Sequence, residues 1–198
     1  MSSSTRLIDL SLEEYSAALA SKDSTPAGGS TAASVGAQGA ALGAMVLWLS
    51  AGKLEGEPRG YLEATAEELE DLGDCLLELV DRDAQAYRSL VAGSKRGLQG
   101  AALEELAQAA LDAPAEIAEL GLIALGRMQL SQHQVSPHLR VDFSVALACL
   151  RTAVESGLEV AEVNLPGLLD AERQVGSRSA LEDLRRGLQE FLKQLDSK

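Results

Sequence analysis

The chain has 198 residues, and this length predicts a single domain that spans residues 1–198. The formal net charge of −13 argues against binding to nucleic acid or to an anionic membrane surface, because both need clustered Lys and Arg side chains. Hydrophobic residues make up 46% of the chain but aromatic residues only 3%, so the core must form by close packing of small side chains and backbones.

The N-terminus and the two cysteines favour a cytoplasmic protein. Residues 1–12 lack the basic start and the apolar run of a signal peptide. Cys75 and Cys149 form no Cys-x-x-Cys motif, and each lies in an apolar helical pattern. We therefore expect two reduced thiols in the core and a cytoplasmic location.

The first predicted helix is short and is followed by a turn. A capping box at residues 11–14 (SLEE) predicts where this helix begins. Residues 26–29 (PAGG) predict a turn, and Ser30 or Thr31 is then expected to cap the next helix.

A helix over residues 30–51 is predicted to be the centre of the fold. No charged residue lies between Asp23 and Lys53, a run long enough to span a bilayer. Its strongly apolar residues cluster only at 45–49, so we expect a helix buried in protein rather than in lipid. Glycines at positions 36, 39 and 43 each cost up to about 1 kcal/mol of helix stability relative to alanine. Their presence indicates that another backbone or a flat ligand lies against that face.

The helix predicted over residues 57–91 carries a carboxylate on its apolar face. Leucines recur at intervals of seven, at positions 62, 69, 76 and 90, and Asp83 occupies the vacant place in this series. A carboxylate on an apolar face needs a partner or has a raised pKa, and both are signs of a functional site. A polar core residue that sets helix register, or an apolar face that ends in solvent, would explain the same pattern.

The remaining sequence predicts three further helices. One covers residues 101–128, where Pro114 is expected to kink or break it. The next starts between residues 138 and 142, and the last starts at a capping box at residues 179–182. No segment alternates with the period of a β-strand for long. We therefore predict an all-α fold, an antiparallel helical bundle with a Gly/Ala-rich central helix.

Further candidate site residues lie outside the leucine-rich helix. Gly28, Gly29 and Ser30 at a helix start could bind an anion through free backbone N–H groups, although a plain turn uses the same residues. Asp142 lies in an apolar setting, where it is either a site residue or the cap of the following helix. Lys53 is the first cation after the uncharged helix, and it is either an exposed lysine or the counter-ion of an acidic ligand.

Four segments, in order, match the pattern of one known family. Residues 24–30 match a Pro-Thr-Pro-Gly-Gly-Gly-Ser-like turn, and residues 45–53 match a Met-Val-x-x-Leu-Thr-x-Gly-Lys-like helix end. Residues 81–87 match an Asp-x-Asp-Ala-x-Ala-Phe segment, and residues 113–120 match a Val-Pro-x-x-Ile-Ala-x-Leu helix. With this order and spacing, the chain resembles the formiminotetrahydrofolate cyclodeaminase and bacterial methenyltetrahydrofolate cyclohydrolase family.

The resemblance implies a reduced folate as the ligand, which is a flat pterin with an anionic glutamate tail. In the cyclohydrolase reaction, water attacks the methenyl carbon that bridges N5 and N10, and the ring opens to 10-formyltetrahydrofolate. In the cyclodeaminase reaction, N10 attacks a formimino carbon and ammonia leaves. The resemblance implies that Asp83 is an acid/base or pterin-holding group, and that Asp142 is its partner. It also implies that Lys53 contacts the folate tail and that Asn164 contacts the pterin or the water. It implies no metal or redox cofactor, and we expect a homodimer.

The chain departs from the family pattern at several positions. Ala27 replaces a glycine, Val160 replaces an asparagine, and Val141 and Ser144 replace a serine and a glycine around Asp142. These departures support an alternative, in which the chain is a non-catalytic helical dimer or a folate-binding scaffold derived from the same family. A chain without a transferase domain favours the cyclohydrolase over the cyclodeaminase reaction.

Overall fold

The computed structural model describes residues 5–196, and these residues contain no β-strand. The α-helices are α1 (Leu12–Leu19), α2 (Gly28–Ala51), α3 (Gly56–Lys95), α4 (Ala101–Ser131), α5 (Arg140–Asn164) and α6 (Ala171–Asp196). Short 3₁₀ turns occur at Leu7–Asp9, Gln132–Gln134, Pro137–Leu139 and Leu165–Gly167. The predicted all-α class is confirmed. The single domain over residues 1–198 stays a prediction, and residues 1–4 and 197–198 lie outside the described residues.

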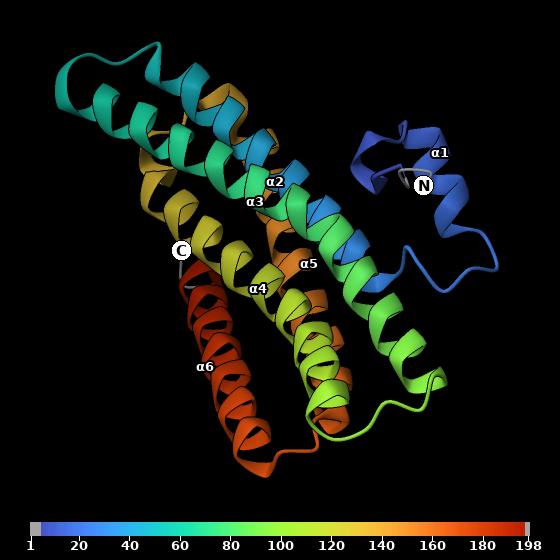
Figure 1. The fold of residues 1–198 in the computed structure, drawn as a ribbon. Coiled ribbons are helices and arrows are strands. Elements are labelled where there is room, and N and C mark those ends of the chain that lie inside the picture. Colours follow the sequence, from blue (N-terminus) through green and yellow to red (C-terminus); the bar gives the residue numbers. More distant parts are fainter. Residues whose placement is uncertain (1–4, 197–198) are drawn as a thin grey trace.

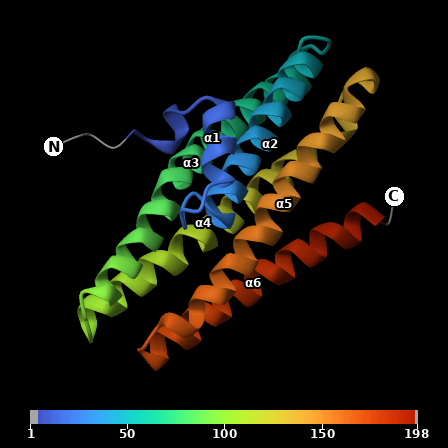
Figure 2. The ribbon, with the colours of Figure 1, turned by 90° about the vertical axis from the view of Figure 1, so that its right-hand side faces the viewer.

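Helix α2 packs between α3 and α5, with α4 on the far side of the bundle (Figures 1 and 2). A Cβ atom at Gly39 would lie 2.9 Å from the Cβ of Cys149 on α5, and one at Gly43 would lie 2.9 Å from the Sδ of Met128 on α4. These glycines are therefore needed for close helix packing within the chain. Among residues 5–196, α2 is the one helix whose length and composition would allow it to cross a membrane, and its inner faces are buried against other helices.

The start of α2 differs from the prediction. The helix begins at Gly28 with Ala27 as its N-cap, so the two glycines form the first helical turn rather than a loop before it. Neither predicted cap residue caps the helix, because the N-cap position makes no side-chain hydrogen bond. The hydroxyl of Thr31 donates instead to the carbonyl of Ala27.

Helix α4 continues through Pro114 because a neighbouring helix compensates for the missing hydrogen bond. Proline has no N–H, so it leaves the carbonyl of Ala110 without its usual helical donor. Asn164, the last residue of α5, supplies a donor, with its Nδ2 2.7 Å from the carbonyl oxygen of Ala110. The two helices are also close here, since a Cβ at Gly157 would lie 2.7 Å from the carbonyl oxygen of Pro114.

Helix α6 begins well before the predicted capping box, so that prediction is wrong. It starts at Ala171, and residues 179–182 lie inside it. Asp170 holds the first turn, because its Oδ1 accepts hydrogen bonds from the backbone N–H groups of Glu172 and Arg173.

The N-terminal segment, residues 5–20, lies over α2 and α3, and the side chains of Leu7, Ile8 and Tyr15 pack against their core (Figures 1 and 2). The predicted capping box at residues 11–14 is present and begins α1, which contains no buried residue. The carboxylate of Asp81 on α3 also holds the segment, because it accepts hydrogen bonds from the backbone N–H groups of Leu7 and Ile8. An apolar groove of about 270 Å³ lies between this segment and the two helices.

The cysteines are unpaired, but one of them is outside the core. Cys149 is half-buried, whereas Cys75 is exposed on α3. The prediction of two core thiols is therefore wrong for Cys75, because the apolar pattern around it belongs to the other side of its helix.

Candidate active site

Asp83 belongs to α3, and its side chain lies against the first turn of α2. It is only 9% exposed, and its Oδ2 accepts a hydrogen bond from the hydroxyl of Ser30 at 2.9 Å. A Cβ atom at Gly29 would lie 2.1 Å from Oδ1 of Asp83, so the carboxylate lies directly against the glycine backbone. Only glycine leaves room for this approach. The apolar face of α3 thus continues as far as Asp83 and does not end in solvent.

The surroundings of Asp83 favour proton exchange. Burial raises the pKa of its carboxyl group above the usual value, and the hydrogen bonds from Ser30 oppose this effect without cancelling it. The partial positive charge at the start of α2 also favours the ionised form. Since burial prevails, the group is closer to its titration point at neutral pH than an exposed aspartate is, and this suits a general acid or base.

Tyr15 is a neighbour of this site that the sequence did not reveal. It belongs to α1, and its buried hydroxyl lies beside the side chain of Thr31. Burial raises the pKa of the Tyr15 phenol, and the nearby carboxylates of Asp83 and Asp81 add to this effect, whereas the Thr31 side chain opposes it. In the sequence, Tyr15 is one member of the apolar stripe of the first helix, and no local signal distinguishes it.

The end of α5 lies at the same end of the bundle as Gly28. A Cβ atom at Gly28 would lie 3.5 Å from Cγ2 of Val160. Asn164 follows one turn later, but its amide nitrogen donates to the carbonyl of Ala110 on α4. Asn164 therefore has a structural role, and only its amide oxygen remains as a candidate ligand group.

Lys53 and Asp142 do not lie near Asp83 within one chain. Helix α5 runs antiparallel to α2, so its start packs beside the end of α2, where the backbone N–H of Ser136 donates to the hydroxyl of Ser50. From Ser30 to Ser50 the helix rises about 30 Å. The predicted partnership of Asp142 with Asp83 is therefore wrong inside a single chain.

At this second end of α2, the predicted residues have new neighbours. Lys53 is exposed, and its Nζ lies 3.2 Å from both ring nitrogens of His138. Asp142 lies in the first turn of α5, where Leu139 is the N-cap and no side chain caps the helix. The cap interpretation of Asp142 is thus wrong as well. Within residues 5–196, no group of three or more His, Cys, Asp or Glu side chains is arranged to hold a metal ion.

The fold and the site define an all-α protein with a buried carboxylate at the start of a Gly/Ala-rich central helix. A family model described as Formiminotransferase-cyclodeaminase matches residues 11–183, and the chain belongs to this family. The resemblance inferred from the sequence is thus confirmed, and it places the chain among folate-related, cyclodeaminase-like proteins.

One solved structure is similar over nearly the whole chain. It is the crystal structure of formiminotetrahydrofolate cyclodeaminase from Thermotoga maritima, with a TM-score of 0.88 and 19% sequence identity. The match covers 95% of this chain and 94% of that chain. At this identity the likeness shows the fold. No curated protein matches the chain.

Proposed function

We propose that this protein is an enzyme of folate one-carbon metabolism that acts on a carbon–nitrogen bond of a tetrahydrofolate derivative. It would be a methenyltetrahydrofolate cyclohydrolase or a formiminotetrahydrofolate cyclodeaminase. The observation that carries this proposal is Asp83, a buried carboxyl group with a raised pKa beside the first turn of α2. Membership of the family supports the choice of a folate as substrate.

Both reactions pass through a tetrahedral carbon and require only proton transfers, which one carboxyl group can perform. In the cyclohydrolase reaction, the carboxylate of Asp83 accepts a proton from the attacking water and returns it to N5 as the carbon–N5 bond breaks. The remaining hydroxyl proton of the tetrahedral carbon is released to solvent as the formyl C=O bond forms. In the cyclodeaminase reaction, the same group accepts the proton of N10 as N10 attacks and then protonates the departing amino group, which leaves as ammonia. Ser30 acts as a positioning residue, because its hydroxyl holds one oxygen of the carboxylate.

The start of α2 supplies the proposed binding surface for the folate. The backbone N–H groups of Gly28, Gly29 and Ser30 lie in the first turn of the helix, where a polar or anionic group of the ligand is stabilised. The amide oxygen of Asn164 would accept a hydrogen bond from the pterin or from water. We further propose a cytoplasmic homodimer that needs no metal or redox cofactor.

The decisive test compares the wild-type protein with Asp83→Asn. Loss of the methenyltetrahydrofolate absorbance measures the cyclohydrolase reaction, and ammonia release from formiminotetrahydrofolate measures the cyclodeaminase reaction. We expect the wild type to accelerate one of them, and Asp83→Asn to lower kcat by about 10²–10⁴-fold. The matched control is Glu104→Gln, which changes a second buried carboxylate that binds the turn before α6 and should leave the turnover of folded protein unchanged. A wild-type protein that accelerates neither reaction would contradict the proposal.

One observation favours the alternative of a non-catalytic scaffold. Val160 lies beside Gly28, so an apolar side chain borders the site where the family pattern has an asparagine. A scaffold predicts that the protein binds a reduced folate, measured by equilibrium dialysis, without turning it over. It also predicts that Asp83→Asn leaves the binding unchanged.

A further inference from the structure

The carboxylate of Asp83 is too deeply covered for a folate to reach it in this conformation. Asp83 is 9% exposed, its Oδ2 accepts the hydrogen bond from Ser30, and a Cβ atom at Gly29 would lie 2.7 Å from that same oxygen. A general acid or base must come within hydrogen-bond reach of the proton that it transfers. An element that covers Asp83 must therefore move before the proposed reaction can occur.

Two elements cover this site, and they are fixed to very different degrees. The first turn of α2 belongs to a 24-residue helix that packs against α3, α4 and α5. The other cover is the N-terminal segment, whose Tyr15 hydroxyl is buried beside Thr31 in that same turn and lies close enough to Asp83 to feel its charge. Neither the 3₁₀ turn Leu7–Asp9 nor α1 contains a buried residue. Regions with few buried contacts open at the lowest free energy, so the N-terminal segment is the cover that moves.

The N-terminal segment is held in place by contacts beside the site. Asp81, two residues before Asp83 on α3, accepts hydrogen bonds from the backbone N–H groups of Leu7 at 2.6 Å and Ile8 at 3.3 Å. Arg6 forms an ion pair with the same carboxylate at 3.8 Å. Because Asp81 and Asp83 lie within one turn of α3, release of these contacts would open the molecule at this site.

The chain around the segment provides a hinge and room to move. Figure 1 shows that a single loop joins α1 to α2, and residues 20–24 of this loop are all exposed. The apolar groove of about 270 Å³ lies beneath the segment, so its packing on α2 and α3 is incomplete. The groove begins one helical turn from the site, at Ser34 after Ser30 on α2 and at Val80 before Asp83 on α3. A segment that swings about residues 20–24 would therefore open the groove and the site together.

We propose that the N-terminal segment is a hinged lid over the Asp83 site, which opens to admit the folate and closes again over it. Asp81 latches the lid, and the side chain of Tyr15 seals the site. Closure keeps the bound folate beside the carboxylate, and opening releases the product. Asp81 and Tyr15 are thus positioning residues. This proposal rests on the proposed function for the identity of the ligand, whereas the movement can be measured without any ligand.

A cysteine beneath the lid measures its opening. In a Cys75→Ser, Cys149→Ser background, Val80→Cys places one thiol in the wall of the groove, where Val80 is 2% exposed. The rate at which an aromatic disulfide reagent modifies this thiol follows the fraction of time that the lid is open. The matched control is Val46→Cys on α2, because Val46 is 0% exposed in a core cluster that the lid does not contact. We expect modification at position 80 to be at least about tenfold faster than at position 46.

Weakening the latch should raise the reactivity of position 80 alone. Asp81→Ala removes the acceptor of two backbone N–H groups, and hydrogen bonds to a charged group are strong enough to change the open fraction by about tenfold or more. The control is Asp74→Ala, which removes an exposed carboxylate about two turns earlier on α3 and should change nothing. Leu7→Ala weakens the lid from its own side and should also raise the reactivity. Unchanged protection at position 46 shows that each variant is folded.

A bound folate tests whether the lid serves the site. The probe is 5-formyltetrahydrofolate, a stable reduced folate, and its dissociation constant is measured by equilibrium dialysis. If the lid closes over it, a concentration of about ten times this constant should slow modification at position 80 by about tenfold. Asp81→Ala should also release the bound probe faster than Asp74→Ala does, because the latch no longer holds the lid closed.

Each result has a separate meaning. Equal reactivity at positions 80 and 46, or an Asp81→Ala variant that reacts like Asp74→Ala, would overturn the lid. A lid that opens but whose opening does not respond to bound probe would overturn its role at the site. A protein whose lid opens, but which neither binds nor turns over a reduced folate, would overturn the proposed function and leave the movement of the lid supported.

Discussion

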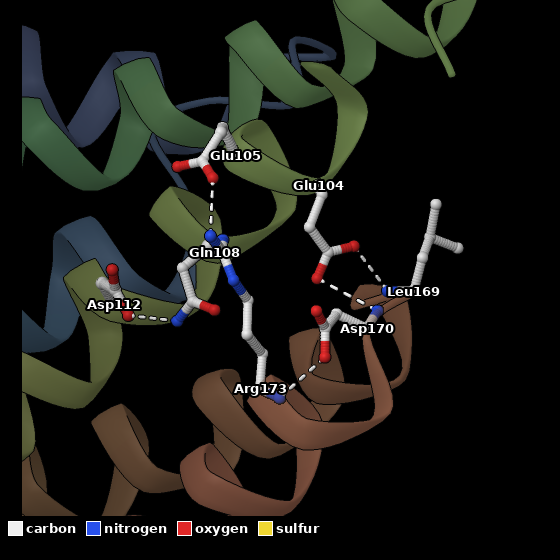
Figure 3. Close-up of polar contacts among 7 residues, drawn as sticks. All are labelled: Glu104, Glu105, Gln108, Asp112, Leu169, Asp170 and Arg173. Carbon is white, nitrogen blue, oxygen red and sulfur yellow. Dashed lines mark hydrogen bonds and ion pairs between the residues drawn. The ribbon is translucent and has the colours of Figure 1, made fainter. Parts of the chain in front are cut away.

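Two buried carboxylates lie within residues 5–196, and their partners differ. Glu104, in the first turn of α4, is 6% exposed and accepts hydrogen bonds from the backbone N–H groups of Leu169 and Asp170, at 2.6 and 3.2 Å (Figure 3). Asp83 is 9% exposed, and within residues 5–196 its carboxylate accepts hydrogen bonds from one residue, Ser30. The two acids are buried to almost the same degree, so burial by itself does not mark a catalytic group.

The difference lies in which donors reach each carboxylate. Glu104 joins the start of α4 to the turn between α5 and α6, and the ion pair between Glu105 and Arg173 lies beside it (Figure 3). Backbone donors cannot move without moving the chain, so this carboxylate holds a turn in place. Asp83 is held by one residue, Ser30, through its hydroxyl and its backbone N–H, and burial raises the pKa of the carboxyl group. The hydroxyl can rotate when the carboxyl group gains or loses a proton. Glu104 is therefore structural, and Asp83 is suited to chemistry.

The largest expected effect on stability is that of Glu104→Ala. It removes the acceptor of two backbone N–H groups, and hydrogen bonds to a charged group contribute about 1.5–3 kcal/mol each. We expect the free energy of unfolding to fall by about 3 kcal/mol, measured by urea denaturation. Asp83→Asn should lower the free energy of unfolding by less, because the amide oxygen still accepts a hydrogen bond from the Ser30 hydroxyl. If both variants lose the same free energy of unfolding, the two acids do not have different roles, one structural and one chemical.

The glycines beside Asp83 provide a closely matched pair. Gly29→Ala would place a Cβ 2.1 Å from Asp83, whereas Gly28→Ala would place one at an ordinary 3.5 Å from Val160. We expect Gly29→Ala to destabilise the fold by about 1–3 kcal/mol and to displace the carboxylate. Thermal unfolding and the folate assays measure the two consequences. Gly28→Ala should be nearly neutral in both, and a similar loss in the two variants would contradict the close approach of Asp83 to Gly29.

Asn164 has a structural role that a double-mutant cycle can isolate. Asn164→Ala leaves the carbonyl of Ala110 without a donor and should cost about 1 kcal/mol of unfolding free energy. Pro114→Ala restores the helical N–H that this carbonyl lacks. In the Pro114→Ala background, the cost of Asn164→Ala should therefore be smaller. An unchanged cost would mean that Asn164 acts through some other contact.

The smallest expected effect is a dependence of stability on pH. Burial raises the pKa of Asp83 in the folded state, so the folded protein holds a proton on this group at pH values where the unfolded chain has released it. The contribution of Asp83 to stability therefore falls as the pH rises from the unfolded pKa through the folded pKa. Asp83→Asn has no charge to bury, so its melting temperature relative to wild type should increase from pH 4 to pH 8. Each 1 kcal/mol corresponds to about 2–4 °C for a chain of this size. A difference in melting temperature that does not change with pH would contradict the raised pKa.

Much of the fold could be predicted from local patterns. The capping box at residues 11–14, the Gly/Ala-rich helix and the leucine series with Asp83 each depend on residues within a few turns of one another. Helix periodicity records which side of a helix is buried, so it also placed Asp83 on the buried side of α3. The family resemblance depended on the order of such local segments, and the match to the family model confirmed it.

Other features depended on partners that are distant in the sequence. The turn before α6 is held by Glu104 on another helix, and the continuity of α4 through Pro114 depends on Asn164 at the end of α5. No local pattern encodes these contacts. The predicted partnership of Asp142 with Asp83 is not formed within one chain, because residue types and spacing do not tell which end of an antiparallel helix meets which.

The sequence by itself therefore determined the all-α class, the place of Asp83 in the apolar series of its helix, and the family. Only the tertiary structure decided that the Asp83 carboxylate lies against the backbone of Gly29, and that Lys53 and Asp142 lie at the other end of α2. The physical reason is that the two kinds of feature depend on contacts over different distances along the sequence. Helix formation and burial follow from neighbours along the chain, whereas a site is defined by groups whose distance is set by how whole helices pack.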